Sequence, residues 1–277
     1  MTYLNSIEPE QAVIDLIDSG NSCAVIRLGD GDLALLAHPE VQRIPDRHRL
    51  CRATPETDTA LKPMLVEAIK AADIVGLREN WQGVERMPYF APDFAERVLT
   101  HYDAKPKRVV SINCMYRLTV DGRLFRSLAG KTVLPVGAHA WALHGAWMES
   151  EFQDYYAAME VGGIGYLAHG VLAPMSNAAT YIEEIWRAVK AEVHLWKHDA
   201  ILFSCGNVSK VLAVRARDEL GVQAIDWGEM MSIMAGVPRP TRPHIGHKFD
   251  YRSPCYAPRP TAREVADILY CRDACAP

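Results

Sequence analysis

Short apolar runs alternate with longer amphipathic stretches along most of the chain. Each apolar run has the length and composition of a buried strand, and each amphipathic stretch carries apolar residues at helical spacing. Because parallel strands must be joined by crossovers, the alternation predicts an α/β fold, a Rossmann-like and mostly parallel sheet flanked by helices. The predicted strands are Cys23–Leu28, Ile74–Leu77, Arg108–Ile112, Thr132–Val136, Ile164–Ala168, Ala200–Ser204 and Val222–Ile225. The predicted helices are Glu8–Asp18, Leu33–His38, Thr57–Ala71, Asp93–Tyr102, Ala140–Met159, Asn177–Val193, Val208–Leu220 and Thr261–Tyr270.

The pattern changes near residue 235, and we predict a single α/β domain over residues 1–235. Beyond it, prolines stand at positions 238, 240, 243, 254, 258 and 260, which excludes a continuous helix or a central strand. Residues 236–277 are therefore predicted to form an extended Pro-rich arm and a short C-terminal helix that pack on the domain. The basic side chains of the arm are either solvated or close over a phosphorylated ligand.

Composition narrows the classes of function. Hydrophobic residues make up 49% of the 277 residues and charged residues 23%, which is typical of a globular protein with a full core. The net charge of −4 gives no broad attraction for nucleic acid or for an anionic membrane. No apolar run approaches the length of a membrane span and Met1–Ile7 lacks a signal pattern, so we expect no transmembrane segment and a cytoplasmic location. The seven cysteines form no CxxC pair, so neither a disulfide framework nor a structural zinc site is indicated.

The first candidate site follows the first predicted buried strand, where the chain reads Arg-Leu-Gly-Asp-Gly-Asp from Arg27 to Asp32. Asp30 and Asp32 are carboxylates one residue apart, and Mn²⁺ and Mg²⁺ prefer carboxylate together with phosphate oxygens. Arg27 adds a charge whose geometry suits phosphate. The alternative is ordinary turn chemistry, with Asp32 as the N-cap of the following helix.

Two further strand exits carry polar side chains. Gly206, Asn207 and Lys210 lie where a strand ends and a helix begins, and the free amides at a helix start form a ready anion site. Asp226 and Glu229 follow the last predicted strand, where either could act as a general base or cap the next helix. Ligands of open α/β sheets bind at the carboxyl ends of the strands, so these turns are expected to share one site.

Asn113 and Arg117 follow the strand Arg108–Ile112, where the arginine either serves the same site or lies on the surface. The sequence contains neither a Walker loop nor a GxGxxG motif, which disfavours nucleotide kinases and classical dinucleotide enzymes.

Taken in order along the chain, these motifs resemble those of the bacterial GT-D-fold glycosyltransferases. That family has an Arg-x-Gly-Asp-Gly-Glu strand exit, an Asn followed by Arg-Tyr elements, a Pro-x-x-Asn-Ala helix start and a late Gly-rich turn ahead of Gln-Ala-Ile-Asp-x-Gly. The segments that carry the resemblance are Arg27–Asp32, Asn113 with Arg117, Pro174–Ala178, Gly206 and Gln223–Gly228. The chain departs from the pattern twice, with Asp32 in place of the Glu and with Glu229 where the family commonly has His.

The resemblance implies transfer of a sugar from a nucleoside diphosphate sugar, usually a UDP-sugar, to a glycan or glycoconjugate acceptor in surface polysaccharide assembly. In that family the first motif holds Mn²⁺ or Mg²⁺ at the diphosphate, which assigns the metal to Asp30 and Asp32. Asp226 or Glu229 would deprotonate the acceptor. The residues expected to hold the nucleotide and its phosphates are Arg27, Gly29, Asn113, Arg117, Gly206, Asn207 and Lys210.

Two alternatives stand beside this interpretation. The first is a haloacid-dehalogenase-like phosphatase or phosphotransferase with Asp30 as the nucleophile, although Gly29 separates Asp30 from the apolar run and no Thr follows Asp32. The second is a non-catalytic subunit that binds a nucleotide sugar. Whether the chain forms a homo-oligomer is left open.

Overall fold

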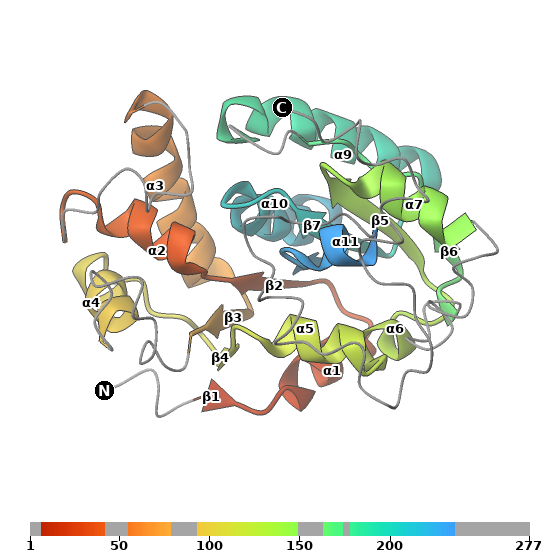
Figure 1. Ribbon diagram of the computed structural model, residues 1–277, viewed down its shortest axis with the longest axis horizontal. Helices are drawn as coiled ribbons and strands as arrows, with labels where there is room; N and C mark the ends of the chain where they lie inside the picture. The colour runs from red at the N-terminus through yellow and green to blue at the C-terminus, as the bar shows by residue number, and fades with distance from the viewer. Residues whose placement is uncertain (1–6, 42–54, 79–92, 149–162, 174–177, 236–277) are drawn as a thin grey trace.

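The computed structural model describes residues 7–41, 55–78, 93–148, 163–173 and 178–235. Within them a single eight-stranded sheet has the order β1-β4-β3-β2-β8-β7-β5-β6, and every neighbouring pair with an assigned register is parallel (Figure 1). The strands are β1 (Ile7–Glu8), β2 (Cys23–Arg27), β3 (Ile74–Leu77), β4 (Val109–Ser111), β5 (Thr132–Gly137), β6 (Tyr166–Leu167), β7 (Ala200–Ser204) and β8 (Gln223–Asp226). The predicted fold class is confirmed.

Helices cover both faces of the sheet, and Figure 1 shows α9 and α10 over one face and α1, α5 and α6 over the other. The elements that pack on the first face are α2 (Asp30–Ala37), α3 (Pro55–Ala71), α4 (Phe94–His101), α9 (Ile182–Trp196), α10 (Val208–Arg215) and the π-helix η6 (Ala216–Leu220). Those on the second face are α1 (Gln11–Asp18), α5 (Cys114–Val120), α6 (Arg123–Ser127), α7 (Ala140–Met148) and α11 (Met230–Met234). A short 3-10 helix, η5 (Ala178–Tyr181), precedes α9.

Strand side chains alternate between the two cores. Val25 lies in the core under α1 and α5, whereas Ala24 and Ile26 lie in the core under α2 and α3. Both faces are therefore dry, which is why the central strands read as continuous apolar runs. This burial also fixes the register, because a slip by one residue would exchange the two faces.

The boundaries of several elements differ from the predicted ones. Helix α2 begins at Asp30, and the turn at Asn113–Arg117 is the start of α5. The helix expected over Val208–Leu220 is divided into α10 and η6 at Ala216. Neither β1 nor α11 was predicted, because both are too short to show a periodicity.

Some predictions lie outside the described residues. These are the arm over residues 236–277, the second half of the helix expected at Ala140–Met159, and the motif from Pro174 to Asn177. Within the described part of the chain, no helix combines the length and the hydropathy needed to cross a membrane.

The order of the strands creates a topological switch point at β2. β2 pairs with β3, the next strand along the chain, on one side and with β8, the last strand, on the other. The helices that follow them, α2 after β2 and α11 after β8, pack on opposite faces of the sheet. In open α/β sheets this is where ligands bind, outside the carboxyl ends of the strands.

Candidate active site

The exit of β2 is organised around the carboxylate of Asp32. Gly29 is the N-cap of α2, and its backbone N–H donates to Oδ2 of Asp32 at 2.8 Å. A carboxylate at the third helical position that reaches back to the N-cap is half of a capping box, and the helix dipole favours its charge. Asp30, the first residue of the helix, is only partly buried, whereas the Asp32 side chain is enclosed. The predicted capping role of Asp32 is therefore realised, from position N3 rather than from the N-cap.

Lys210, in the first turn of α10, lies between two carboxylates. Its Nζ is 2.9 Å from Oδ2 of Asp226 and 3.3 Å from Oδ2 of Asp32, and it donates to the carbonyl oxygen of Gly206 at 3.0 Å. All three charged side chains are buried. Three separate elements, α2, β8 and α10, thus meet through a single ammonium group.

Burial and charge act against each other in this cluster. Burial raises the pKa of Asp32, and the neighbouring Asp226 carboxylate raises it further, while Lys210 lowers it. Burial lowers the pKa of Lys210, but the carboxylates of Asp226 and Asp32 outweigh that effect and leave the pKa above its ordinary value. Lys210 is therefore a firmly charged ammonium shared by two carboxyl groups, and one positive charge compensates two negative ones incompletely.

Asp226 is held by the backbone as well as by Lys210. Its Oδ2 accepts the N–H of Arg27 at 3.3 Å, and its Oδ1 accepts the N–H of Gly228 at 3.2 Å. Only 1% of the residue is exposed. A general base must come within reach of the acceptor hydroxyl, so this buried carboxylate, engaged at both oxygens, suits the role of a structural anion for Lys210.

The Arg27 side chain is held in place by residues that are distant from it in sequence. Its Nε donates to the carbonyl oxygen of Ile112 at 2.9 Å, and its Cζ stacks 4.6 Å from the centre of the Tyr116 ring. Gly228 has a φ of +61°, and a Cβ at that position would clash with Nη1 of Arg27. Glycine suits this position through its backbone conformation, and any Cβ there would displace the Arg27 guanidinium.

The turn after β7 completes the cluster. The Ser209 hydroxyl accepts the N–H of Cys205 at 2.7 Å, and the Ser204 hydroxyl donates to the carbonyl oxygen of Gly228. Gly206 has a left-handed φ of +61°, which any other residue would adopt at a cost. Asn207 follows as the N-cap of α10, but its side chain makes no capping hydrogen bond.

Two polar atoms in this region are buried and lack a hydrogen-bond partner. They are Oδ1 of Asp32, an acceptor, and Nδ2 of Asn207, a donor. Leaving such atoms unsatisfied costs about 1–3 kcal/mol each, so native structures rarely keep them without a water or a ligand. They mark the place where the strand exits can take up a bound group.

The candidate ligands for a divalent cation are two carboxylates of α2, which stand two residues apart in the helix and so do not face each other directly. The spare Oδ1 of Asp32 and the partly buried carboxylate of Asp30 are oxygen ligands of the kind that Mg²⁺ and Mn²⁺ prefer. Across the described residues there is no group of three or more His, Cys, Asp and Glu side chains that could enclose a metal. A cation held by two carboxylates would keep water or phosphate oxygens as its other ligands, which is the usual arrangement for Mg²⁺ with a phosphorylated substrate.

The remaining predicted site residues lie at the border of the cluster or away from it. Glu229, partly buried, is the N-cap of α11 directly after β8. Asn113 is the N-cap of α5 after β4, and its backbone N–H donates to the Ser111 hydroxyl at 3.2 Å. Arg117 is exposed on α5 and forms an ion pair with Glu10 at 2.7 Å. The structure thus unites Arg27, Gly29, Asp32, Gly206, Lys210 and Asp226, while Arg117 makes its ion pair elsewhere and its part in donor binding stays a prediction.

Three contributors were not foreseen from the sequence. Tyr116 supplies the face on which Arg27 rests, Ser204 ties β7 to the turn after β8, and Gly228 leaves room for Arg27. The sequence shows Tyr116 next to Arg117 and Gly228 after a strand, but Arg27, the residue that both contact, is far from them along the chain. No local spacing could therefore reveal them.

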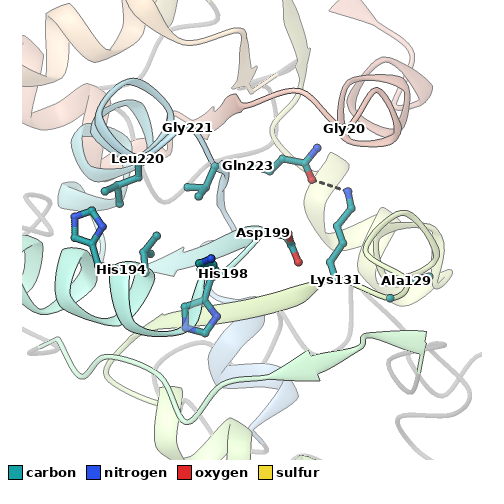
Figure 2. A pocket seen from close by; sticks show the side chains of 13 residues that line it. Gly20, Ala129, Lys131, His194, His198, Asp199, Leu220, Gly221 and Gln223 are labelled. Carbon is teal, nitrogen blue, oxygen red and sulfur yellow. Dashed lines mark hydrogen bonds between the residues drawn. The ribbon is translucent and has the colours of Figure 1, made fainter.

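A cavity of about 750 Å³ lies at the opposite edge of the sheet, by the amino ends of β5, β7 and β8 (Figure 2). Three helical segments end at it, before Gly20, Lys197 and Gly221. Helix C-termini carry partial negative charge and so disfavour a diphosphate. Lys131 neutralises part of this charge, because it donates to the carbonyl oxygen of Ile17 and to Gln223. None of the predicted site residues lines this cavity.

Comparison with known proteins places the described cluster within a recognised domain. The profile of the GT-D-like family, described as a GT-D fold-like domain, matches residues 10–234. No curated protein matches the chain.

Three solved structures are similar in fold. "A New Glycosyltransferase (DUF1792) from Streptococcus sanguinis" has a TM-score of 0.55 at 20% identity, over 82% of each chain. A structure of domain of unknown function 1792 in selenomethionine form has a TM-score of 0.54 at 22% identity, over 83% of this chain and 80% of the other. A third, reported as a domain of unknown function 1792 with a distinct glycosyltransferase fold, has a TM-score of 0.52 at 21% identity, over 83% and 80% of the two chains.

Proposed function

Since the chain belongs to the GT-D-like family, we propose that it is a glycosyltransferase that uses a nucleoside diphosphate sugar. The donor binds at the switch point between β2 and β8. The observation that carries this proposal is the buried cluster of Asp32, Lys210 and Asp226 with the two unpartnered atoms beside it, at the edge where α/β folds take up ligands. The donor is expected to be a UDP-sugar, because the motifs of this chain resemble, in the same order, those of the bacterial GT-D-fold glycosyltransferases.

The start of α10 is suited to the diphosphate. The positive end of the helix dipole and the amides of the first turn favour an anion, and Lys210 lies in that turn. Nδ2 of Asn207 is a hydrogen-bond donor without an acceptor, and a phosphate or ribose oxygen would supply one. Backbone amides and an unused donor therefore converge at one helix start, where Lys210 offsets the charge of Asp226 and Asp32.

Asp30 and Asp32 would hold a Mn²⁺ or Mg²⁺ ion with the diphosphate. When bound, such an ion neutralises charge that develops on the leaving nucleoside diphosphate. Asp32 is prepared for this, because Gly29 and Lys210 hold one of its oxygens and leave the other unpartnered. The shorter Asp32 in place of the family's Glu thus still presents a free oxygen ligand.

The acceptor hydroxyl requires a base, and Glu229 is the better candidate. It is partly buried at the N-cap of α11, whereas both oxygens of Asp226 are already engaged. A base at this place would take the proton of an acceptor that approaches across the carboxyl ends of β7 and β8. A glycan or glycoconjugate of surface polysaccharide is the acceptor class that the resemblance favours.

Calorimetry with a panel of UDP-sugars tests the donor site. We expect binding with Mn²⁺ present, and weaker binding with EDTA or in Asp30→Asn. The matched control is Asp93→Asn, which removes an exposed carboxylate whose partner is Arg97 and should leave the affinity unchanged. Equal binding with and without the metal would contradict the metal site, and absence of binding to every UDP-sugar would contradict the donor class.

A further inference from the structure

The exit of β5 lies beside the cluster, and its side chains are not used by the donor site. Gly137 at the end of β5 is in register with Ser204, and Phe203 is in register with Asp226. Two strand spacings, about 10 Å, therefore separate the end of β5 from the end of β8. Helix α7 begins shortly after β5, and Trp141 is its second residue.

Trp141 is exposed and yet held in place. The residue is 51% exposed, while its indole Nε1 donates to the carbonyl oxygen of Gly170 at 3.2 Å. Its ring lies 4.7 Å from the ring of His169 at an interplanar angle of 34°. An exposed aromatic side chain that is already immobilised loses little entropy when a ligand covers it.

Polar groups border this aromatic surface. His169 is exposed, and its ring lies 5.2 Å from that of His144, whose Nδ1 is 2.9 Å from the carbonyl oxygen of Leu167. The surface therefore offers a flat apolar face with imidazole nitrogens at its border. A pyranose has the complementary form, because its C–H groups gather on one face and its hydroxyls project around the rim.

We propose that Trp141, with His169 at its side, is the subsite for the acceptor sugar. This inference rests on the proposed function, because it assigns a neutral pyranose acceptor to the transferase. The position fits, since the surface lies at the same edge as Glu229 and follows β5, the neighbour of β7, from which the diphosphate turn leaves. A nucleobase stacked on Trp141 is the competing occupant, and the test below separates the two.

Saturation-transfer NMR with methyl glycosides of glucose, galactose and N-acetylglucosamine tests the subsite directly. We expect a signal from at least one glycoside with the native protein, about tenfold weaker affinity in Trp141→Ala and partial recovery in Trp141→Phe. The matched control is Trp196→Ala, because Trp196 is 61% exposed at the end of α9, on the opposite edge of the sheet. That control should bind the glycosides as the native protein does.

UDP-sugar calorimetry on the same samples separates the two proposals. If UDP-sugars bind but no glycoside does, or if glycosides bind equally to Trp141→Ala, the acceptor subsite is wrong and the donor site stands. If Trp141→Ala loses UDP itself, Trp141 stacks the nucleobase and the subsite is also overturned. Failure of the native protein to bind any UDP-sugar contradicts the proposed function, whatever the glycosides do.

Discussion

The ammonium nitrogen of Lys210 lies 2.9 Å from Oδ2 of Asp226, and both side chains are buried. The two residues come from different elements, α10 and β8, and Asp32 of α2 joins them through the same ammonium. A buried carboxylate that keeps its partner is tolerated, whereas one that loses it is not. The stability of the domain and the form of the proposed donor site therefore depend on one lysine.

Lys210→Met is the variant that exposes this dependence. It leaves Asp226 and Asp32 buried without their cation, so we expect a loss of about 3–5 kcal/mol in the free energy of unfolding. Urea unfolding measures it. Lys70→Met is the control, since Lys70 forms a surface pair with Glu67 and should change stability by less than about 1 kcal/mol. A cost at Lys210 no larger than at Lys70 would show that the buried ion pair is absent.

Gly228→Ala should cost more than an ordinary left-handed glycine substitution. The new Cβ would meet Nη1 of Arg27, so Arg27 must leave its place on Tyr116 in addition to the backbone strain. Gly221→Ala is the matched control, because Gly221 has a φ of +67° and nothing within 4 Å of a Cβ. We expect about 1–2 kcal/mol for the control, from backbone strain alone, and a clearly larger loss for Gly228→Ala. Equal losses in urea unfolding would remove the argument for the Arg27 contact.

Asp32 should make the protein less stable as pH rises. Its pKa is raised in the folded state, mainly by burial, so the unfolded chain releases this proton first. The unfolded state then binds fewer protons, and stability falls from about pH 4, the unfolded pKa, up to the raised folded pKa. Over that window the unfolding free energy of the native protein should fall relative to that of Asp32→Asn, which lacks this titration.

Glu8 provides the opposite sign as an internal control. Its pKa is lowered by hydrogen bonds from Arg108, so its contribution is present above the unfolded pKa and is lost as pH falls through the folded one. Glu8→Gln should therefore differ from the native protein at neutral pH and converge with it in acid. If both variants show the same slope, burial of Asp32 is not the controlling factor.

Glu229→Gln should slow turnover strongly without loss of the fold. Removal of a general base costs about 10²–10⁴-fold in rate, while the partly buried position of Glu229 predicts little change in unfolding. Asp226→Asn should do the reverse and act first on stability, since Asp226 is the buried partner of Lys210. Product release in the presence of a UDP-sugar measures the effect on turnover, and a melting curve measures the effect on stability. Full activity in Glu229→Gln would show that Glu229 is not the general base.

The sequence contained the strands that matter for this site. Ala200–Ser204 and Ile74–Leu77 were predicted with the bounds of β7 and β3, because strands buried on both faces are continuous apolar runs. The same rule fails for β1, whose two residues carry no periodicity and whose position is decided by pairing with β4. The π-helix η6 was invisible for a similar reason, since an amphipathic pattern does not distinguish it from α10.

Within the candidate site, the strand exits could be predicted but the pairing across them could not. Asp32, Lys210 and Asp226 each follow or end a buried strand, which identified them individually. That Lys210 joins the two carboxylates depends on the strand order β2-β8-β7, a property of the whole chain. Arg117 shows the converse, because it stands near a strand exit in sequence but pairs with Glu10 in space.

Release of UDP from a UDP-sugar panel by the purified protein tests the central claim most directly. With Mn²⁺ present, we expect UDP release from at least one donor, its loss in Asp30→Asn and its retention in Asp93→Asn. A protein that binds a UDP-sugar but never releases UDP, with or without an acceptor glycoside, would be a binding subunit and would contradict the assignment as a glycosyltransferase.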